Sequence, residues 1–412
     1  DHRDLHSFPT RRSSDLIMDL RQLDLTIPMS YEGGDDMGIL VNAEQMIEQG
    51  WTLSNDRLGA PYGAEYYDFT SNMMHNAGLV VLKLFVFITR NAAVATNLTY
   101  LSIFFMAGII SFFVMKSLKI NCWVSSASSA VFAISPYMLY RGISHIVLTE
   151  CYFVPLSILI CIWIYERDDA LIPDKEFFRK KINYAILFFT FLIANNGIAY
   201  YPFFTCFIFI VTAISKFAKT KKIKQSLSGI IATVFVTSFV ILSIVPGKVY
   251  ALINGANDLA IERAGFEAAE LYGLKISQMF MPLNGHGVYD AVIDKYQSSA
   301  FLITENESAY LGIIGMFGFI ILLICLFIKK SSTHENRIAL LSELNISMVL
   351  LGTVGGLGAM FAFFITPMLR GYNRISIFIE YCCVLSVAII INKIIHRIIE
   401  KNSENQMISK IK

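Results

Sequence analysis

Two adjacent carboxylates stand near the start of the chain, where a helix is expected to begin. Asp35 and Asp36 follow Gly33-Gly34, and the apolar residues of stretch 37–49 recur at helical spacing. One Asp at such a position caps a helix, which stabilises it by about 1 kcal/mol. Only one of the two can cap, which leaves the second carboxylate unexplained. The pair therefore has two chemical interpretations as well. It provides oxygen ligands for a divalent cation such as Mg²⁺ or Mn²⁺, or a general base for an acceptor hydroxyl.

Ionisable side chains also surround the start of an apolar stretch, where they are candidates for binding a substrate. These are Arg141, His145 and Glu150. The alternative for Arg141 is a side chain that extends to the membrane interface, and for the other two a hydrogen bond between helices. His286, in a turn-rich stretch, is a further candidate, with a solvated loop histidine as the alternative.

Two arginines, Arg370 and Arg374, flank Asn373 just before the last apolar stretch. Guanidinium groups form paired hydrogen bonds with phosphate oxygens, so these residues are candidates for binding the phosphate or pyrophosphate of a lipid head group. The alternative is a structural salt bridge to the acidic residues of stretch 247–308.

The composition indicates the kind of element that must position these residues. Of the 412 residues, 55% are hydrophobic and 16% charged, and the net charge is +2. Soluble domains are typically about 45–50% apolar and about 25% charged. The composition therefore excludes a soluble globular or disordered protein. We expect an all-α, polytopic transmembrane bundle whose partners include membrane lipids and no nucleic acid.

Nine apolar stretches have about the length needed to cross a bilayer, which is roughly 17–25 residues. The turn residues Asn195-Asn196-Gly197 divide one long stretch into two helices. The predicted spans are 93–115, 121–139, 145–165, 182–199, 200–217, 227–246, 309–328, 340–364 and 375–396.

Lys and Arg concentrate in alternate connections, which orients the spans. Stretches 17–92 and 247–308 then lie on the same extracytoplasmic face, where we expect them to pack on each other. Residues 1–16 resemble translated sequencing-adapter read-through, and we expect about ten spans in an intact protein. The remaining predicted parts are six spans in 93–246, three in 309–396 and a cytoplasmic tail, 397–412.

The acidic pair belongs to a longer sequence pattern. Gly34-Asp35-Asp36 is followed by Glu48-Gln49-Gly50-Trp51 and Asp68-Phe69, and the pattern continues at 55–63, 270–275, 306–318 and 370–376. These motifs resemble bacterial polytopic membrane proteins of the GT-C glycosyltransferase type, and among them the YfhO-like relatives. The resemblance covers nearly everything after residue 25. One departure is Thr70, which follows Asp68-Phe69 where the family pattern Asp-Phe-Pro has proline.

The resemblance implies a multi-pass protein of the bacterial plasma membrane. GT-C enzymes transfer a sugar from a polyprenyl-phosphate donor to a glycan or lipid acceptor outside the membrane, and they carry an acidic motif in the first external loop. Asp35 matches that acidic residue and Asp36 stands beside it. Asp68 is a candidate for binding the substrate through the same resemblance.

Two classes of function therefore remain, and a third possibility is a relative that keeps the fold without activity. The first is a membrane glycosyltransferase, favoured by the acidic pair, the external arginines and two polar segments on one face. The second is a transporter or flippase of a lipid-linked sugar, for which an internal repeat and ionisable residues in mid-span are typical. Apart from a divalent cation at Asp35 and Asp36, the motifs indicate no cofactor.

Overall fold

The computed structural model describes residues 23–30, 34–59, 61–65, 74–255, 265–283, 290–300, 305–328 and 333–411. Two candidate site residues, Asp68 and His286, lie outside the described residues, as does the adapter-like stretch 1–16.

The described chain is mostly helical, as the sequence predicts, with one small antiparallel hairpin of strands β1 (Ser54–Asn55) and β2 (Ala64–Glu65). Five helices are long and apolar enough to cross a membrane. They are α5 (Ala92–Ser117); the joined α8 (Ile146–Thr149) and α9 (Val154–Glu166); α11 (Tyr200–Thr220); α12 (Ile223–Asn254); and η5 (Tyr372–Ile375) with α18 (Ser376–Ile411).

The other four predicted spans correspond to shorter or interrupted helices, so the count of nine is not confirmed. Ser135 and Pro136 end one helix and start the next, because the Ser135 hydroxyl accepts the N–H of Tyr137 at 3.2 Å. Another span breaks at Gly355, whose φ of +69° suits glycine. The helices that correspond to these four predicted spans are α6 (Cys122–Ala133), α7 (Pro136–Arg141), α10 (Lys181–Ala194), α15 (Gly312–Cys325), α16 (Thr333–Gly352) and α17 (Leu357–Phe364).

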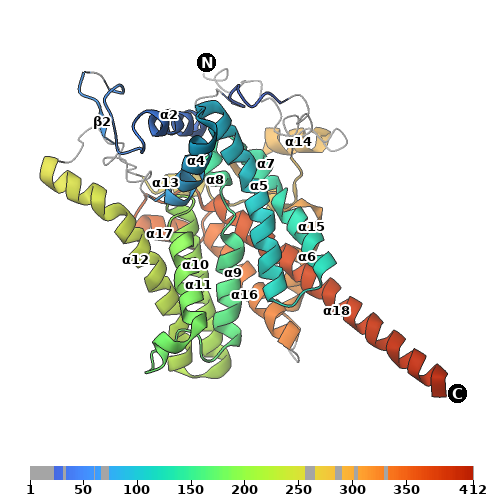
Figure 1. Cartoon of the computed structure of the whole chain (residues 1–412). Coiled ribbons are helices and arrows are strands. Elements are labelled where there is room, and N and C mark those ends of the chain that lie inside the picture. Colours follow the sequence, from blue (N-terminus) through green and yellow to red (C-terminus); the bar gives the residue numbers. More distant parts are fainter. Residues whose placement is uncertain are drawn as a thin grey trace.

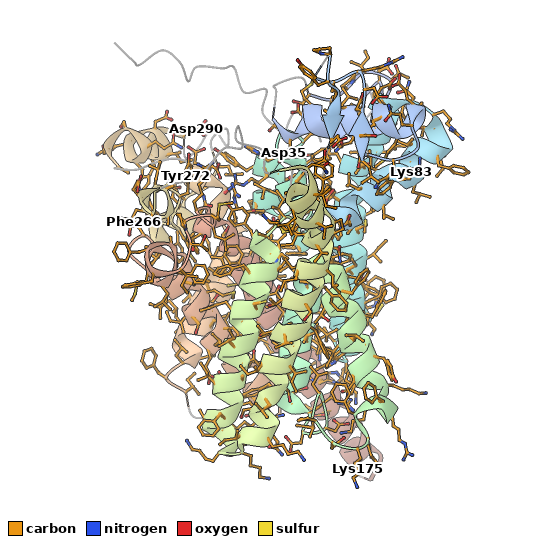
Figure 2. All side chains as sticks on the ribbon, turned by 90° about the vertical axis from the view of Figure 1, so that its left-hand side faces the viewer. Asp35, Lys83, Lys175, Phe266, Tyr272 and Asp290 are labelled. Atoms are coloured by element: carbon orange, nitrogen blue, oxygen red, sulfur yellow. The ribbon has the colours of Figure 1, made fainter. Side chains whose placement is uncertain are left out.

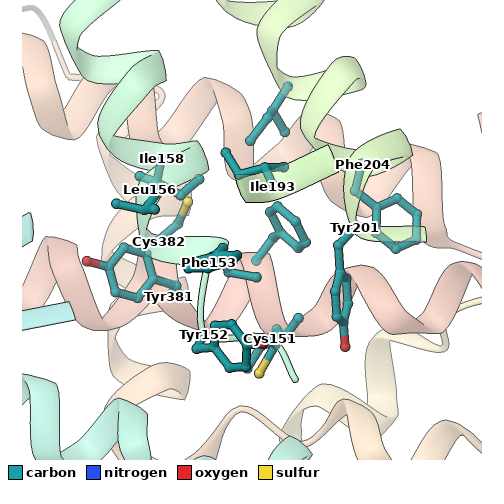
Figure 3. Close-up of a cluster of buried hydrophobic side chains, with 14 of the residues drawn as sticks. Cys151, Tyr152, Phe153, Leu156, Ile158, Ile193, Tyr201, Phe204, Tyr381 and Cys382 are labelled. Carbon is teal, nitrogen blue, oxygen red and sulfur yellow. The ribbon is translucent and has the colours of Figure 1, made fainter. Parts of the chain in front are cut away.

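The centre of the bundle is formed by α9 and the first half of α18. The most apolar part of Ile146–Glu166 is 94% buried and that of Tyr372–Lys401 is 83% buried, against 22% for α12. A helix that is apolar all round is buried inside a large protein or a membrane. Figure 3 shows part of this core, where Tyr381 and Cys382 of α18 lie beside Leu156 and Ile158 of α9.

Short elements cover one end of the bundle, at which Asp35 and Asp290 lie, whereas Lys175 lies at the opposite end (Figure 2). The 3₁₀ helix η2 (Phe177–Arg179) follows Lys175. The covering elements are α2 (Asp35–Glu48), α4 (Asn76–Thr89), α13 (Glu267–Leu271), η3 (Ile276–Phe280), α14 (Asp290–Ser299) and η4 (Glu305–Ala309), some of which are labelled in Figure 1.

Candidate functional site

A buried and a largely buried arginine converge on one carboxylate at the covered end of the bundle. The Nη1 of Arg141, at the end of α7, lies 2.7 Å from Oε2 of Glu305, and the Nη2 of Arg374, in η5, lies 3.3 Å from the same oxygen. Arg141 also donates from Nη2 to the hydroxyl of Ser308 at 3.0 Å. The side chains of Arg141, Arg374 and Glu305 are 1%, 12% and 28% exposed. Three remote segments of the chain thus form one charged cluster, called here the arginine cluster.

Glu305 is held in its charged form by this arrangement. Burial by itself raises the pKa of a carboxyl, but the guanidinium charges of Arg141 and Arg374 outweigh it and hold the pKa of Glu305 at about 2. The arginine cluster contains two positively charged guanidinium groups and one ionised carboxylate. Glu305 therefore balances only one of the two positive charges.

Asp35 lies within electrostatic reach of the arginine cluster. It is the first residue of α2 and is half-buried, and its N–H donates to the carbonyl of Ser144 at 2.8 Å. The preceding Gly34 permits this contact, because a Cβ there would lie 2.3 Å from the Ser144 oxygen. Burial raises the pKa of Asp35, while the charges of His145 and Arg374 oppose that rise.

The interpretation of the acidic pair as a helix cap is wrong. Gly34 occupies the N-cap position of α2, no side chain caps the helix there, and both acids lie in its first turn. Asp36 is 2% exposed, and among the described residues neither of its carboxylate oxygens has a hydrogen-bond partner. Within the same residues no group of three or more His, Cys, Asp or Glu side chains could hold a metal ion. Asp35 and Asp36 would therefore supply only part of a cation's ligands.

His145 and Glu150 take different positions at the start of α8 and α9. His145 precedes α8 and acts electrostatically on Asp35; burial and the charge of Arg141 lower the pKa of His145. Glu150 is 1% exposed, and its Oε2 lies 3.3 Å from Nδ1 of His75. Sequence reasoning missed His75. The available signal was its position immediately before an apolar stretch, where an ionisable side chain is a functional candidate.

Arg370 and Arg374 lie apart from each other in the structure. Arg370 places its guanidinium carbon 4.9 Å from the ring centre of Tyr272, whereas Arg374 lies over Tyr200 at 4.2 Å and joins the arginine cluster. The expected salt bridge to stretch 247–308 is present for Arg374, because its partner Glu305 lies in that stretch.

A family model described as "Domain of unknown function (DUF6311)" matches residues 78–372. The chain belongs to this family. The DUF6311 match includes Arg141, Glu305 and Arg370, whereas Asp35 precedes it and Arg374 follows it by two residues. No curated protein and no solved structure matches the chain.

Motifs singled out in the sequence meet in this DUF6311 protein at the break between α16 and α17. Leu274 pairs with Thr353 as an isolated parallel bridge, and the N–H of Gly355 donates to Oε2 of Glu270 at 2.8 Å. The N–H of Asn373 donates to the carbonyl of Tyr272 at 3.1 Å. The broken span therefore anchors stretch 270–275 against the segment that carries Arg374.

A further carboxylate, missed by sequence reasoning, lies inside the bundle. Glu380 of α18 is 1% exposed, and the hydroxyl of Ser135 donates to its Oε2 at 2.6 Å. The signal was present, because an acid inside a predicted span is a functional candidate by default. Glu305 carried no such signal, since it is one of several acids in a polar loop.

Proposed function

We propose that this DUF6311 protein is an integral membrane glycosyltransferase of the GT-C type, acting on a polyprenyl-phosphate-linked sugar and an acceptor of the cell envelope. The observation that carries the proposal is the position of Asp35. A half-buried carboxylate lies within electrostatic reach of the guanidinium groups of Arg141 and Arg374, at the end of the bundle that carries the long polar segments. Glycosyl transfer from a lipid phosphate requires a base and a positive site near the membrane surface.

In the proposed reaction Asp35 is the general base. Its carboxylate takes the proton of an acceptor hydroxyl as the acceptor oxygen attacks the anomeric carbon of the donor sugar. The bond from that carbon to the phosphate oxygen breaks, and polyprenyl phosphate leaves with the electron pair. The pKa of Asp35, raised by burial, makes its carboxylate a stronger base than an exposed one. A positioned base typically contributes about 10²–10⁴-fold in rate.

The arginine cluster is the proposed site for the donor phosphate. Its positive charge not matched by Glu305 suits the charge that develops on the leaving phosphate. Arg374 is the better candidate than Arg370, since it is the one whose charge acts on Asp35. A divalent cation remains an alternative role for Asp35 and Asp36, in which the donor phosphate and water complete its oxygen ligands.

The apolar helices support a location in a membrane, which we propose to be the bacterial plasma membrane, with several spans in contact with lipid. The proposed orientation places the Asp35 end outside. It follows from the basic residues near Lys175 and Lys221 at the opposite end.

Replacement of Asp35 by Asn tests the proposal, because the change keeps the shape and removes the charge. Membranes containing the full chain are supplied with polyprenyl-phosphate hexoses, and release of polyprenyl phosphate is measured. We expect Asp35→Asn to reduce release at least 100-fold with an unfolding midpoint that is not lowered, since Asp35 makes no cap. Glu44→Gln, at an exposed position of the same helix, is the matched control and should retain full release. Full release by Asp35→Asn would remove it from the mechanism.

A transporter of the same lipid-linked sugar is the second candidate, favoured by the burial of Glu380 inside the bundle. In that case Glu380→Gln would abolish movement of the lipid across vesicles, whereas Asp35→Asn would not. The glycosyltransferase proposal expects the reverse order of effects.

A further inference from the structure

A basic cavity of about 600 Å³ opens at the end of the bundle opposite Asp35. It lies between the end of α5, the start of α16 and the part of α18 that projects from the bundle in Figure 1. Its lining includes four cationic side chains and one carboxylate, which are Lys119, Arg337, Lys393, Arg397 and Glu400. This excess of positive charge suits an anionic ligand.

The wall of the cavity is fixed by hydrogen bonds within the protein. Arg337 donates to Oε2 of Glu166 at 2.9 Å and to the carbonyl of Leu118 at 2.8 Å, so its charge is matched by Glu166. The side-chain oxygen of Asn392 accepts the N–H of Asn121 at 2.8 Å, which ties α18 to the start of α6. Lys119 and Arg397 stand on this wall with exposed side chains.

Lys119 occupies a backbone position that glycine would suit better. Its φ is +65°, and it follows the C-cap of α5. Its N–H donates to the carbonyl of Lys116, and the N–H of Ile120 donates to the carbonyl of Met115. In helices that end with these two hydrogen bonds, glycine is the most common residue at this position. The local fold therefore does not require lysine here, and glycine can replace Lys119 without backbone strain.

Two features place the cavity at a membrane interface. Trp123, two residues after Asn121, is 84% exposed, and tryptophan is enriched at the head-group level of membranes. Exposed isoleucines at positions 391, 394 and 398 form an apolar stripe along α18, beside the basic residues that line the cavity. At the end of a spanning helix, apolar side chains of this kind face the acyl chains while the long basic side chains beside them reach the head groups.

We propose that this cavity binds the phosphate head group of an anionic phospholipid. Lys119 and Arg397 contact the phosphate, and the isoleucine stripe of α18 contacts the acyl chains. Basic pockets between membrane helices are suited to such head groups. The site is independent of the proposed glycosyl transfer, because it lies at the other end of the bundle.

Lipid binding to the purified full chain tests the proposal. The protein in detergent is titrated with phosphatidylglycerol or phosphatidylcholine, and the bound lipid is counted by native mass spectrometry. We expect Lys119→Gly and Arg397→Gln each to weaken phosphatidylglycerol binding about fivefold, with no effect on phosphatidylcholine. Lys119→Gly should not lower the unfolding midpoint, since glycine suits its φ.

Lys221→Gly is the matched control. Lys221 is also exposed, also ends a helix with a positive φ of 57°, and lies outside the cavity lining at the same end of the bundle. It should leave phosphatidylglycerol binding unchanged. Equal weakening by both lysine variants, or no weakening by Lys119→Gly, would overturn the proposal. So would displacement of the lipid by an equal concentration of glycerol 3-phosphate, because the site would then bind a free anion.

Discussion

Arg141 and Arg374 approach the same oxygen of Glu305, although one arginine ends α7 and the other precedes α18. The shared carboxylate joins the start of the central helix α18 to the connection between α7 and α8. The relationship gives Glu305 a structural role that is separate from any chemistry at Asp35.

Removing the charge of Glu305 should destabilise the protein strongly. Glu305→Gln leaves two guanidinium groups without their anion, and breaking a buried ion pair in this way costs about 3 kcal/mol or more. Unfolding with sodium dodecyl sulfate in mixed micelles measures the free energy. Glu267→Gln, at an exposed position of the same polar stretch, should change it by less than about 0.5 kcal/mol. Equal stability of the two variants would contradict a structural role for Glu305.

The same carboxylate predicts a pH dependence of stability. The pKa of Glu305 is about 2 in the folded chain against an ordinary 4.5. A depressed pKa contributes stability that is fully present above about pH 4.5 and is lost as the pH falls toward 2. The unfolding midpoint of the protein should therefore fall between pH 5 and pH 3. Glu305→Gln should reduce the slope in this interval, and an unchanged slope would assign the acid sensitivity to other groups.

Gly34 and Gly38 provide a matched pair on α2. A Cβ at position 34 would meet the Ser144 carbonyl at 2.3 Å, whereas one at position 38 would meet nothing within 4 Å. Gly34→Ala should therefore displace the start of α2, cost roughly 1–3 kcal/mol and reduce any activity that depends on Asp35. Gly38→Ala, inside the helix, should stabilise the protein by up to about 1 kcal/mol. Destabilisation by both would indicate that α2 tolerates no added methyl group.

Cysteine labelling tests the orientation of the bundle. Asp290→Cys and Lys175→Cys, in a Cys122→Ser background that removes the exposed native cysteine, lie at opposite ends. A membrane-impermeant maleimide added to intact cells should label position 290 and leave position 175 unlabelled until the cells are opened. Labelling in the reverse order would invert the proposed topology.

The parts of this fold that local sequence determines were predictable. The turn at Asn195 divides α10 from α11 as expected, and the helix after the acidic pair is α2. Helix lengths were harder to predict, because mean hydropathy does not detect an interruption such as Ser135-Pro136 inside an apolar stretch. The hydrophobic pattern gave the existence of α6 and α15 but not their ends.

The candidate site was predictable in its residue types and only partly in its contacts. Asp35, Arg141 and Arg374 were selected singly, from charge near the ends of apolar stretches. Their common partner Glu305 could not be chosen from among the acids of its loop, since tertiary packing brings it between the arginines. Asp35 and Asp36 look alike in the sequence, yet the direction in which each leaves the first turn makes one half-buried and the other fully buried.

The short helices have a consequence for any bilayer around the bundle. At about 1.5 Å per residue, the 14 residues of α10 or α15 extend about 21 Å, against a hydrocarbon thickness of about 30 Å. Both helices expose apolar side chains, such as Phe188 and Phe317. Hydrophobic mismatch of this size is relieved by local thinning of the lipid. A bilayer that α10 and α15 cross should therefore be thinner beside them than beside the 32-residue α12, so that lipids around the protein meet an uneven, tapered boundary.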